Sequence, residues 1–405
     1  MSNQPVHVCL VIRQFWPTLA GAAERMRRYA PGLSLREVKM VVVCFWRDGL
    51  SRTECLEDGT QIVRVEKIGT LQDADAALFK QAAVCLQQLP EGRRVLQTNL
   101  LGPHTVHHIA RLVANGIPAV YLGTMNEVEP EKNSLIRRWL RAWRLRRLFH
   151  PFAAAVVGSE SMRHWLLNSG VAPAKVHQIG HGVDLARFHP SADSREKNAL
   201  RRQFNLPETA WIVLFVGTMT ERKGVHLLVN AWNQIQQAKP NTMLVMLGAF
   251  DRPTVMKSEQ RAELHQFQEQ LRQSMEPLIN CGTLIHHEHT PDIQHWMQVA
   301  DALVLPSAKE GVPNVVLEAM ACSLPCVLTR FQGFPEDELG EEGVHYLITE
   351  RCVTGLAQAL LQLQENPSQG AQIGAAAFKW ARCHFDLNLT LDRYVDLYHN
   401  LVRPD

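Results

Sequence analysis

The segment ADALVLPSAKEGVPNVVLEAMACSLP, residues 300–325, carries the signal that decides the fold. It opens on a short apolar run (ALVLP) that is typical of a strand buried on both faces. Gly311 and Pro313 then interrupt regular structure, and a helical stretch follows at 314–322. A strand, a loop and a helix in this order predict a phosphate site, because backbone N–H groups at a helix N-terminus attract anions. We expect that contact at Val312, Pro313, Asn314 and Val315.

Two glutamates flank this expected phosphate site. Glu310 precedes the helix, in the loop, and Glu318 lies about one turn inside it. An ionised carboxylate only accepts hydrogen bonds, so it suits sugar hydroxyls and repels phosphate. Two carboxylates beside an anion site therefore suit a sugar nucleotide, one for the ribose and one for the transferred sugar. The alternative is an ordinary helix N-terminus with two solvated glutamates, which the spacing alone does not exclude.

A second segment, FVGTMTERKGVH at residues 215–226, shows the same order of strand, glycine, loop and helix start. Arg222 and Lys223 place two fixed positive charges at the same edge of the expected sheet as Glu310. Positive charges at that edge can neutralise the charge that builds on a leaving diphosphate. The alternative is a solvent-exposed basic pair before a helix.

The rest of the chain alternates short apolar runs with helical patterns, as in a doubly wound α/β protein. Strands are expected at residues 6–12, 38–45, 61–65, 94–97, 119–122 and 153–158, with helices at 22–35, 76–89, 104–114 and 161–168. After a turn-rich segment the pattern restarts, with strands at 211–216, 242–247, 279–282, 302–305 and 325–328, and helices at 224–238, 258–275, 293–300 and 314–322. Two Rossmann-like halves joined near residue 185 are the economical interpretation.

Length and composition fit two domains with large cores. The 405 residues are 46% hydrophobic and 20% charged, and the net charge of +2 does not suggest a nucleic-acid partner. Residues 1–185 carry 23 Lys and Arg against 15 Asp and Glu, a net charge of +8; the remaining residues carry 19 against 25, a net of −6. A basic half suits an anionic membrane or acceptor, and chance variation of surface charge is the alternative.

Several features concern the compartment of the protein. Nine scattered cysteines without a CxxC pair favour reduced, buried thiols in a cytosolic protein. The N-terminus MSNQPVHVCLVI runs directly into a strand, so we expect no signal peptide. The longest apolar stretches are under about ten residues, too short to span a bilayer. A cytoplasmic location is expected, with peripheral attachment to the inner face of a membrane as an option.

Residues 136–149 (IRRWLRAWRLRRLF) are the candidate for that attachment. They carry six arginines, and the apolar residues at 136, 139, 140, 143 and 148 share helical spacing. Tryptophans beside arginines suit a helix that lies in a membrane interface. The hypothesis is that this helix binds anionic lipid near a lipid-linked acceptor. The alternative is an amphipathic helix packed on its own domain, with the arginines in water.

Together the two ligand segments resemble the retaining glycosyltransferases of family four, which have the GT-B fold, two Rossmann-like domains facing a cleft. The family's acidic pair appears as Glu310 and Glu318 with seven residues between them, and its glycine-and-lysine loop is similar to residues 217–224. The segment GHGVDLARFHP at 180–190 resembles the interdomain linker, and Gly21 opens a stretch (GAAER) similar to the first glycine-rich loop. The likeness implies an acceptor-side domain at 1–185, a nucleotide-sugar-binding domain at 186–377, and a helix at 378–405 that crosses back to the first domain.

The resemblance implies a role for each matching position. Glu318 would hold the nucleotide ribose, and Glu310 would contact the donor sugar. Lys223, with Arg222, would bind the diphosphate, and Gly21 would bring backbone N–H groups near the reaction centre. Further donor contacts would come from Gly217, Thr218, Val312, Pro313, Asn314 and Val315. The family moves a sugar from a nucleotide sugar to a hydroxyl acceptor with retained configuration and needs no metal. A saccharide or lipid-linked acceptor is expected, in polysaccharide or glycolipid biosynthesis.

The sequence departs from the family pattern at several positions. Thr218 stands where an arginine is usual, so Arg222 would supply that charge. No histidine follows the strand at 119–122, where one often contacts the acceptor. The acceptor-side candidates there are Thr124, Asn126 and Glu127. Two other functions stay open: a sugar-nucleotide epimerase of similar fold, and a non-catalytic nucleotide-sugar-binding protein, for which the missing histidine leaves room.

Two groups of potential metal ligands have simpler explanations. Asp73 and Asp75 match the DxD motif that binds metal in the other glycosyltransferase fold, but they lie at an expected helix start, where aspartates cap the helix. The run HHEH at 286–289 has adjacent histidines that point in different directions, so a polar loop that walls the nucleotide pocket is the favoured interpretation. No GxGxxG motif follows the first strand, which weakens a dehydrogenase interpretation.

Overall fold

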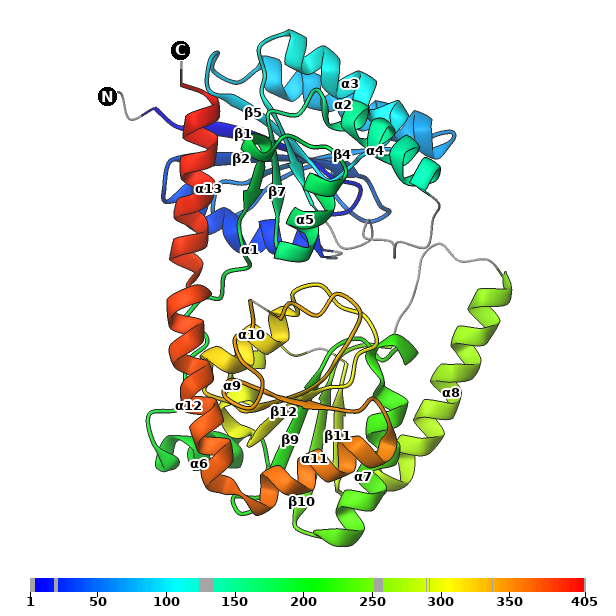
Figure 1. Cartoon of the computed structure of the whole chain (residues 1–405), viewed down its shortest axis with the longest axis vertical. Coiled ribbons are helices and arrows are strands. Elements are labelled where there is room, and N and C mark those ends of the chain that lie inside the picture. The colour runs from blue at the N-terminus through cyan, green and yellow to red at the C-terminus, as the bar shows by residue number, and fades with distance from the viewer. Residues whose placement is uncertain are drawn as a thin grey trace. The chain divides into compact units, whose positions relative to one another are not determined.

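The computed structural model describes residues 4–17, 21–123, 135–250, 258–288, 290, 292–336 and 338–403, with the backbone alone for 135–141 and 258–260. The chain divides into two compact units (Figure 1). Unit 1 contains Met1–Gly182 and Leu387–Asp405, and unit 2 contains Val183–Asp386. Both are α/β units with one sheet each. None of the described helices combines the length and apolarity needed to cross a bilayer.

Unit 1 is built on an eight-stranded sheet in the order β3-β4-β2-β1-β5-β6-β7-β8. Neighbouring strands are parallel except β3 and β4, an antiparallel pair at one edge. The strands are β1 Val6–Val11, β2 Val38–Phe45, β3 Thr53–Cys55, β4 Gln61–Val65, β5 Arg94–Thr98, β6 Ala119–Leu122, β7 Ala154–Val157 and β8 Val176–Gln178. Strands β3 and β8 are absent from the sequence-based expectation because three residues carry too little apolar pattern.

Helices cover both faces of the unit 1 sheet. Residues alternate along a strand, so Val6, Val8 and Leu10 join one core while Cys9 and Val11 join the other. This burial on both faces explains the continuous apolar run near the start of the chain. The helices are α1 Ala22–Ser34, α2 Leu71–Gln87, α3 Pro103–Ala114, α4 Leu135–Phe149, α5 Glu160–Asn168, the 3-10 turn η2 Pro173–Lys175, and α13 Leu387–Leu401.

Unit 2 has a six-stranded, entirely parallel sheet in the order β11-β10-β9-β12-β13-β14. Counted along this unit the order is 3-2-1-4-5-6, the strand order of a Rossmann fold. The strands are β9 Trp211–Val216, β10 Thr242–Leu247, β11 Leu284–His287, β12 Ala302–Leu305, β13 Cys326–Thr329 and β14 Leu347–Thr349. The order reverses between β9 and β12, and ligands bind beside the carboxyl ends of strands at such a reversal. The two segments singled out from the sequence follow these two strands.

The expected strand at 279–282 is wrong. Residues 279 and 280 are the last two of helix α8, Ser258–Asn280, and the strand lies later, at β11. Gly282 ends the helix in the left-handed region, with a φ of 75°, and turns the chain into β11. The helices of unit 2 are α6 Ser194–Gln203, the 3-10 turn η3 Glu221–Lys223, α7 Val225–Ala238, α8 Ser258–Asn280, α9 Ile293–Val299, α10 Asn314–Ala321, α11 Val353–Glu365 and α12 Pro367–His384.

The C-terminal segment consists of two helices, so the single helix that the resemblance implies at 378–405 is also wrong. Helix α12 belongs to unit 2 and α13 to unit 1, and the units divide after Gly182 and after Asp386. The domains expected from the sequence end at 185 and 377. Helix α13 packs closely on α1, because a Cβ atom added to Gly32 would lie 2.3 Å from a methyl carbon of Leu391. This close packing ties the end of the chain into the core of unit 1.

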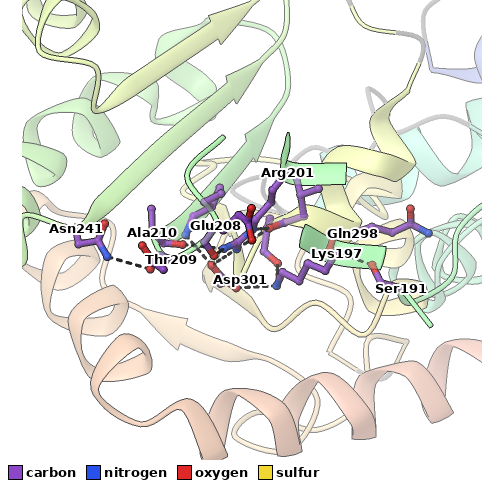
Figure 2. Close-up of polar contacts among 12 residues, drawn as sticks. Ser191, Lys197, Arg201, Glu208, Thr209, Ala210, Asn241, Gln298 and Asp301 are labelled. Atoms are coloured by element: carbon purple, nitrogen blue, oxygen red, sulfur yellow. Dashed lines mark hydrogen bonds and ion pairs between the residues drawn. The ribbon is translucent and has the colours of Figure 1, made fainter. Parts of the chain in front are cut away.

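A polar network at the amino-terminal edge of the unit 2 sheet joins helix α6 to strands β9 and β12. Figure 2 shows Lys197 and Arg201 converging on Asp301, with distances of 2.7 and 2.8 Å to its carboxylate oxygens. The backbone N–H of Ile212 donates to the same carboxylate at 2.8 Å. Arg201 is 4% exposed and also donates to the carbonyl oxygens of Glu208, Ala210 and Val299. Because the network lies where strands begin, we assign it a structural role.

Candidate active site

Two loops meet at the carboxyl edge of the unit 2 sheet, between β9 and β12. The first contains η3 Glu221–Lys223 and ends at Gly224, and the second follows β12. A Cβ atom added to Gly224 would lie 2.1 Å from the carbonyl oxygen of Pro306. The Ala308 N–H donates to the carbonyl oxygen of Arg222 at 2.8 Å. The close approach of the loops therefore requires glycine at position 224, which also has a φ of 72°.

The carboxylate of Glu310 lies where these loops meet. Its Oε1 atom is 2.7 Å from Lys223 Nζ and 3.1 Å from Arg222 NH1, and it accepts a hydrogen bond from Ser307 Oγ at 2.7 Å. The side chains of Glu310 and Lys223 are only 11% and 13% exposed, so salt screens their attraction less than that of a surface pair. Two fixed positive charges against one carboxylate leave a local surplus of positive charge. The structure thus brings the three predicted catalytic residues together in a setting that suits a diphosphate.

Helix α10 begins at Asn314, with Pro313 as its N-cap residue. The first N–H groups of a helix have no hydrogen-bond partner within the helix. In α10 the Val316 N–H donates to the carbonyl oxygen of Pro313, the residue just before the helix. A helix start of this kind is the feature from which an anion site is predicted for residues 312–315, and that site stays a prediction. Val312, just before the helix, packs partly buried against the core of unit 2.

Glu318 lies in the second turn of α10 and is 5% exposed. Its negative charge acts on the neighbouring thiol of Cys322. Burial is the larger cause that raises the pKa of this thiol, and the charge of Glu318 raises it further. The Cys322 thiol therefore stays protonated and takes no part as a nucleophile. Glu310 and Glu318 belong to one loop–helix segment, one before the start of α10 and one inside it, as the spacing predicts.

A second close approach lies next to this site, between the loops after β9 and β10. A Cβ atom added to Gly248 would lie 2.0 Å from the carbonyl oxygen of Gly217. His286 Nε2 is 2.9 Å from the carbonyl oxygen of Gly248, so this histidine holds the loop from strand β11. The polar loop expected for the histidine run is therefore wrong for its first two residues, and His289 lies outside the described residues. Thr218 is exposed beside Gly217.

Two residues that support the site escape sequence-based prediction. Thr329 Oγ1 donates to the carbonyl oxygen of Ser307 at 2.7 Å. Arg351, after β14, donates to the carbonyl oxygens of Pro306 and Glu221 at 3.0 Å each, and so braces both loops. These contacts join segments that are distant in the sequence, so no local pattern marks them.

The candidates in unit 1 are only partly within the described residues. Gly21 is the N-cap residue of α1, with a φ of 41°. Among the residues the structure describes, none comes within 4 Å of a Cβ atom added there. Thr124, Asn126 and Glu127, the acceptor-side candidates, lie outside the described residues.

The two aspartates of the DxD match have different roles. Thr70 N–H donates to Asp73 Oδ2 at 3.0 Å and Asp73 N–H donates to Thr70 Oγ1 at 3.3 Å, so the capping prediction is confirmed for Asp73. It is wrong for Asp75, which is fully buried, forms an ion pair with Arg13 and accepts a hydrogen bond from His104. The reason is that α2 begins earlier than expected and places Asp75 on its inner face. Within the described ranges, no group of three or more His, Cys, Asp or Glu side chains could hold a metal ion.

Two family models match the chain, one on each unit. The model for glycosyl transferases group 1 matches residues 196–380, and the model for Glycosyltransferase Family 4 matches residues 19–187. The first match includes both loops of the site in unit 2, and the second begins just before Gly21.

Curated relatives and a solved structure agree with these matches. The chain is 28% identical over 251 residues to a D-inositol 3-phosphate glycosyltransferase from Jonesia denitrificans, covering 60% of this chain but only 57% of that protein. It is 28% identical over 341 residues to alpha-maltose-1-phosphate synthase from Mycolicibacterium smegmatis, covering 77% and 82%. The crystal structure of HepE from Anabaena in complex with UDP-glucose has a TM-score of 0.71 at 18% identity, covering 98% of this chain and 99% of that one. The chain therefore belongs to the glycosyltransferases of family four and has their GT-B fold.

Proposed function

We propose that this protein is a retaining enzyme that moves a sugar from a nucleotide-sugar donor to a hydroxyl acceptor, in polysaccharide or glycolipid biosynthesis. The observation that carries the proposal is the meeting of Glu310 with Lys223 and Arg222 beside the N-terminus of α10. Carboxylates suit sugar hydroxyls, and fixed positive charge suits a diphosphate. A nucleotide sugar combines these two chemistries in one molecule, and it binds to unit 2.

Each residue has a distinct task in this proposal. Lys223, Arg222 and the first N–H groups of α10 hold the diphosphate. The diphosphate competes with Glu310 for the two cations, and the carboxylate then accepts hydrogen bonds from the donor sugar. Glu318 accepts hydrogen bonds from the ribose. Gly217, which has no side chain, lets the nucleotide come close to the end of β9.

The reaction exchanges one bond at the anomeric carbon for another. The bond from that carbon to the diphosphate oxygen breaks, and the acceptor oxygen bonds to the carbon on the same face, so the configuration is retained. The proton of the acceptor hydroxyl passes to an oxygen of the departing diphosphate, which therefore acts as the base. Lys223 and Arg222 stabilise the negative charge that develops on the diphosphate.

Glu318→Ala should remove most of the thermal stabilisation that the preferred nucleotide provides. We expect one of UDP, GDP, ADP and dTDP to raise the melting temperature of the wild type, because a ligand that binds only the native state stabilises it. Loss of charge-assisted hydrogen bonds to the ribose should weaken that nucleotide about 10- to 100-fold. Thermal unfolding with and without each nucleotide measures the effect. Glu318→Gln, which keeps the side-chain volume, separates lost binding from damaged packing.

The matched control is Glu276→Ala, an exposed glutamate on α8, which should keep the wild-type response. Equal stabilisation of wild type and both Glu318 variants would contradict the ribose role. If none of the four nucleotides stabilises the wild type, the donor site itself is contradicted.

We further propose that unit 1 takes a saccharide or lipid-linked acceptor at the inner face of a membrane, to which helix α4 attaches. Trp143 on this helix is 48% exposed, and the Arg147 guanidinium lies 4.8 Å from the centre of its ring. A groove of about 470 Å³ is lined by Val106, Ala110, Trp143, Arg146, Arg147, His150 and Pro151. An exposed tryptophan among arginines suits the headgroup layer of an anionic membrane.

The double variant Arg146→Glu/Arg147→Glu should bind anionic vesicles at least about tenfold more weakly than wild type, because each basic residue near such a surface contributes about 1 kcal/mol. Cosedimentation with phosphatidylglycerol vesicles at low salt measures this, with phosphatidylcholine vesicles for comparison. The control is Arg202→Glu, which reverses the charge of an exposed residue on unit 2. This variant should cosediment with anionic vesicles to the same extent as wild type. If wild type does not bind anionic vesicles at low salt, the membrane proposal fails and the proposal of glycosyl transfer is unaffected.

A further inference from the structure

A polar cluster in unit 1 lies where the order of its sheet reverses. Strands β1 and β5 are neighbours at that point, and Thr98 Oγ1 ties their ends by donating to the carbonyl oxygen of Val11 at 2.8 Å. Arg13 follows β1, and His104 lies in the first turn of α3, which follows β5. Ligands of α/β folds bind beside carboxyl ends of strands at such a reversal. The cluster therefore occupies the position in unit 1 that the donor site occupies in unit 2.

Both basic side chains are held by Asp75, which extends from α2 and is fully buried. Arg13 Nε is 3.0 Å from Asp75 Oδ1 and Arg13 NH2 is 2.8 Å from Oδ2, while His104 Nε2 is 3.0 Å from the same Oδ2. Burial raises the pKa of Asp75, but the hydrogen bonds from Arg13 and His104 outweigh it, so the pKa lies below its ordinary value. The carboxylate is thus ionised at neutral pH and only accepts hydrogen bonds.

The ionised carboxylate fixes the tautomer of the imidazole. His104 Nε2 must carry the hydrogen that it donates to Asp75, so Nδ1 of the neutral ring presents a lone pair. Glycine at position 102 leaves room for the ring, because a Cβ atom added there would be only 3.0 Å from His104 Cε1. Arg13 uses Nε and NH2 on Asp75, which leaves NH1 on the other side of the guanidinium.

The outward atoms of this cluster are accessible. The side chains of Arg13 and His104 are 41% and 32% exposed. Neither Arg13 NH1 nor His104 Nδ1 has a hydrogen-bond partner among the residues that the structure describes. One atom donates and the other accepts, and a buried carboxylate fixes the position of both.

We infer that Arg13 and His104 bind two neighbouring hydroxyl groups of an uncharged acceptor sugar. A hydroxyl group both donates and accepts, so the pair of outward atoms matches it: Arg13 NH1 donates and His104 Nδ1 accepts. Asp75 is a positioning residue, because it acts on the sugar only through the other two. A phosphate group fits less well, because the buried carboxylate of Asp75 lies behind both side chains and offsets the positive charge of Arg13. The inference rests on the proposed function, because it assigns the acceptor of that reaction.

Binding of simple polyols tests this site directly. The probes are methyl α-D-glucopyranoside, methyl α-D-mannopyranoside and myo-inositol at millimolar concentration, observed by saturation-transfer NMR on the full chain. At least one should bind to wild type, and His104→Ala should weaken it about tenfold, because the accepting atom is lost. Asp75→Asn should weaken it as well, since a neutral amide no longer fixes the tautomer. His107→Ala, an exposed histidine on the same helix, is the matched control and should bind like wild type.

Three outcomes would overturn the inference: no polyol signal in wild type, unchanged binding by His104→Ala, or displacement of the polyol by inorganic phosphate. Thermal unfolding of the same variants with nucleotide distinguishes failure of this site from failure of the proposed glycosyl transfer. His104→Ala should retain the wild-type response to the preferred nucleotide. Polyol binding without any nucleotide effect would support this site and contradict the proposed function. A nucleotide effect without polyol binding would contradict this site alone.

Discussion

Replacing Glu310 with glutamine should reduce glycosyl transfer by about a thousandfold in kcat/KM, because it removes preorganised charge from the reacting groups. The Oε1 atom of Glu310 is contacted by Lys223, Arg222 and Ser307, and glutamine has the same shape without the charge. The two cations then lose the carboxylate that positions them, and the donor sugar loses its strongest hydrogen-bond acceptor. Initial rates with the nucleotide sugar chosen by thermal shift, with the product identified by mass spectrometry, measure the effect.

The fold should survive this substitution. Arg222 is 48% exposed and remains solvated, while Lys223 is less well paired, which costs on the order of 1 kcal/mol and about 2–4 °C in melting temperature. Glu336→Gln is the control, because Glu336 is 65% exposed and pairs with the surface residue Arg330. That control should turn over like wild type. Wild-type turnover by Glu310→Gln would show that the carboxylate does not serve the reaction.

The same assay separates the other functions that the sequence leaves open. An epimerase would convert the nucleotide sugar without an acceptor, and its product would be another nucleotide sugar. A non-catalytic binding protein would show nucleotide stabilisation without turnover in wild type. Acceptor-dependent release of the nucleoside diphosphate, lost in Glu310→Gln, fits glycosyl transfer alone.

Most strands of both sheets can be predicted from the sequence. The strands expected at 38–45, 61–65, 119–122, 211–216, 242–247 and 302–305 agree residue for residue with β2, β4, β6, β9, β10 and β12. Parallel strands covered on both faces are mostly apolar along their length, so a short run rich in valine and leucine marks them clearly. Because the ligand segments follow β9 and β12, their place at the sheet reversal also follows from the pattern.

The predictions from the sequence fail where a strand is polar, or where contacts between distant segments determine the role of a residue. Strand β11 ends in two histidines, and one of them hydrogen-bonds the Gly248 loop, so its apolar signal is too weak to predict. The side-chain contacts of Asp75 join α2 to Arg13 after β1 and to His104 in α3. The local sequence alone favours a helix cap for an acidic residue near a helix start. Arg351 braces the site through two backbone carbonyls far away in the sequence. Such contacts depend on the assembled fold rather than on any local pattern.

The close approach of the two site loops leads to the second large expected effect. Gly224→Ala should destabilise unit 2 by about 3 kcal/mol or more, which lowers its melting temperature by about 10 °C. Two costs add here: alanine at a φ of 72° is strained, and its Cβ would lie 2.1 Å from the Pro306 carbonyl oxygen. That contact is with backbone, so the loop after β12 must move, and it carries Ser307 and Glu310. Transfer activity measured well below the melting temperature should therefore also fall.

Gly282→Ala measures the part of this effect that comes from backbone strain alone. Gly282 has a φ of 75°, nearly that of Gly224, but no described atom lies within 4 Å of an added Cβ atom. It should cost only the backbone strain, about 1 kcal/mol or about 3 °C, with transfer activity unchanged. The difference between the two variants then measures how tightly the loops after β9 and β12 are pressed together. Equal losses in both would mean that backbone strain alone explains the requirement for Gly224, and that the two loops are free to separate without cost to the site.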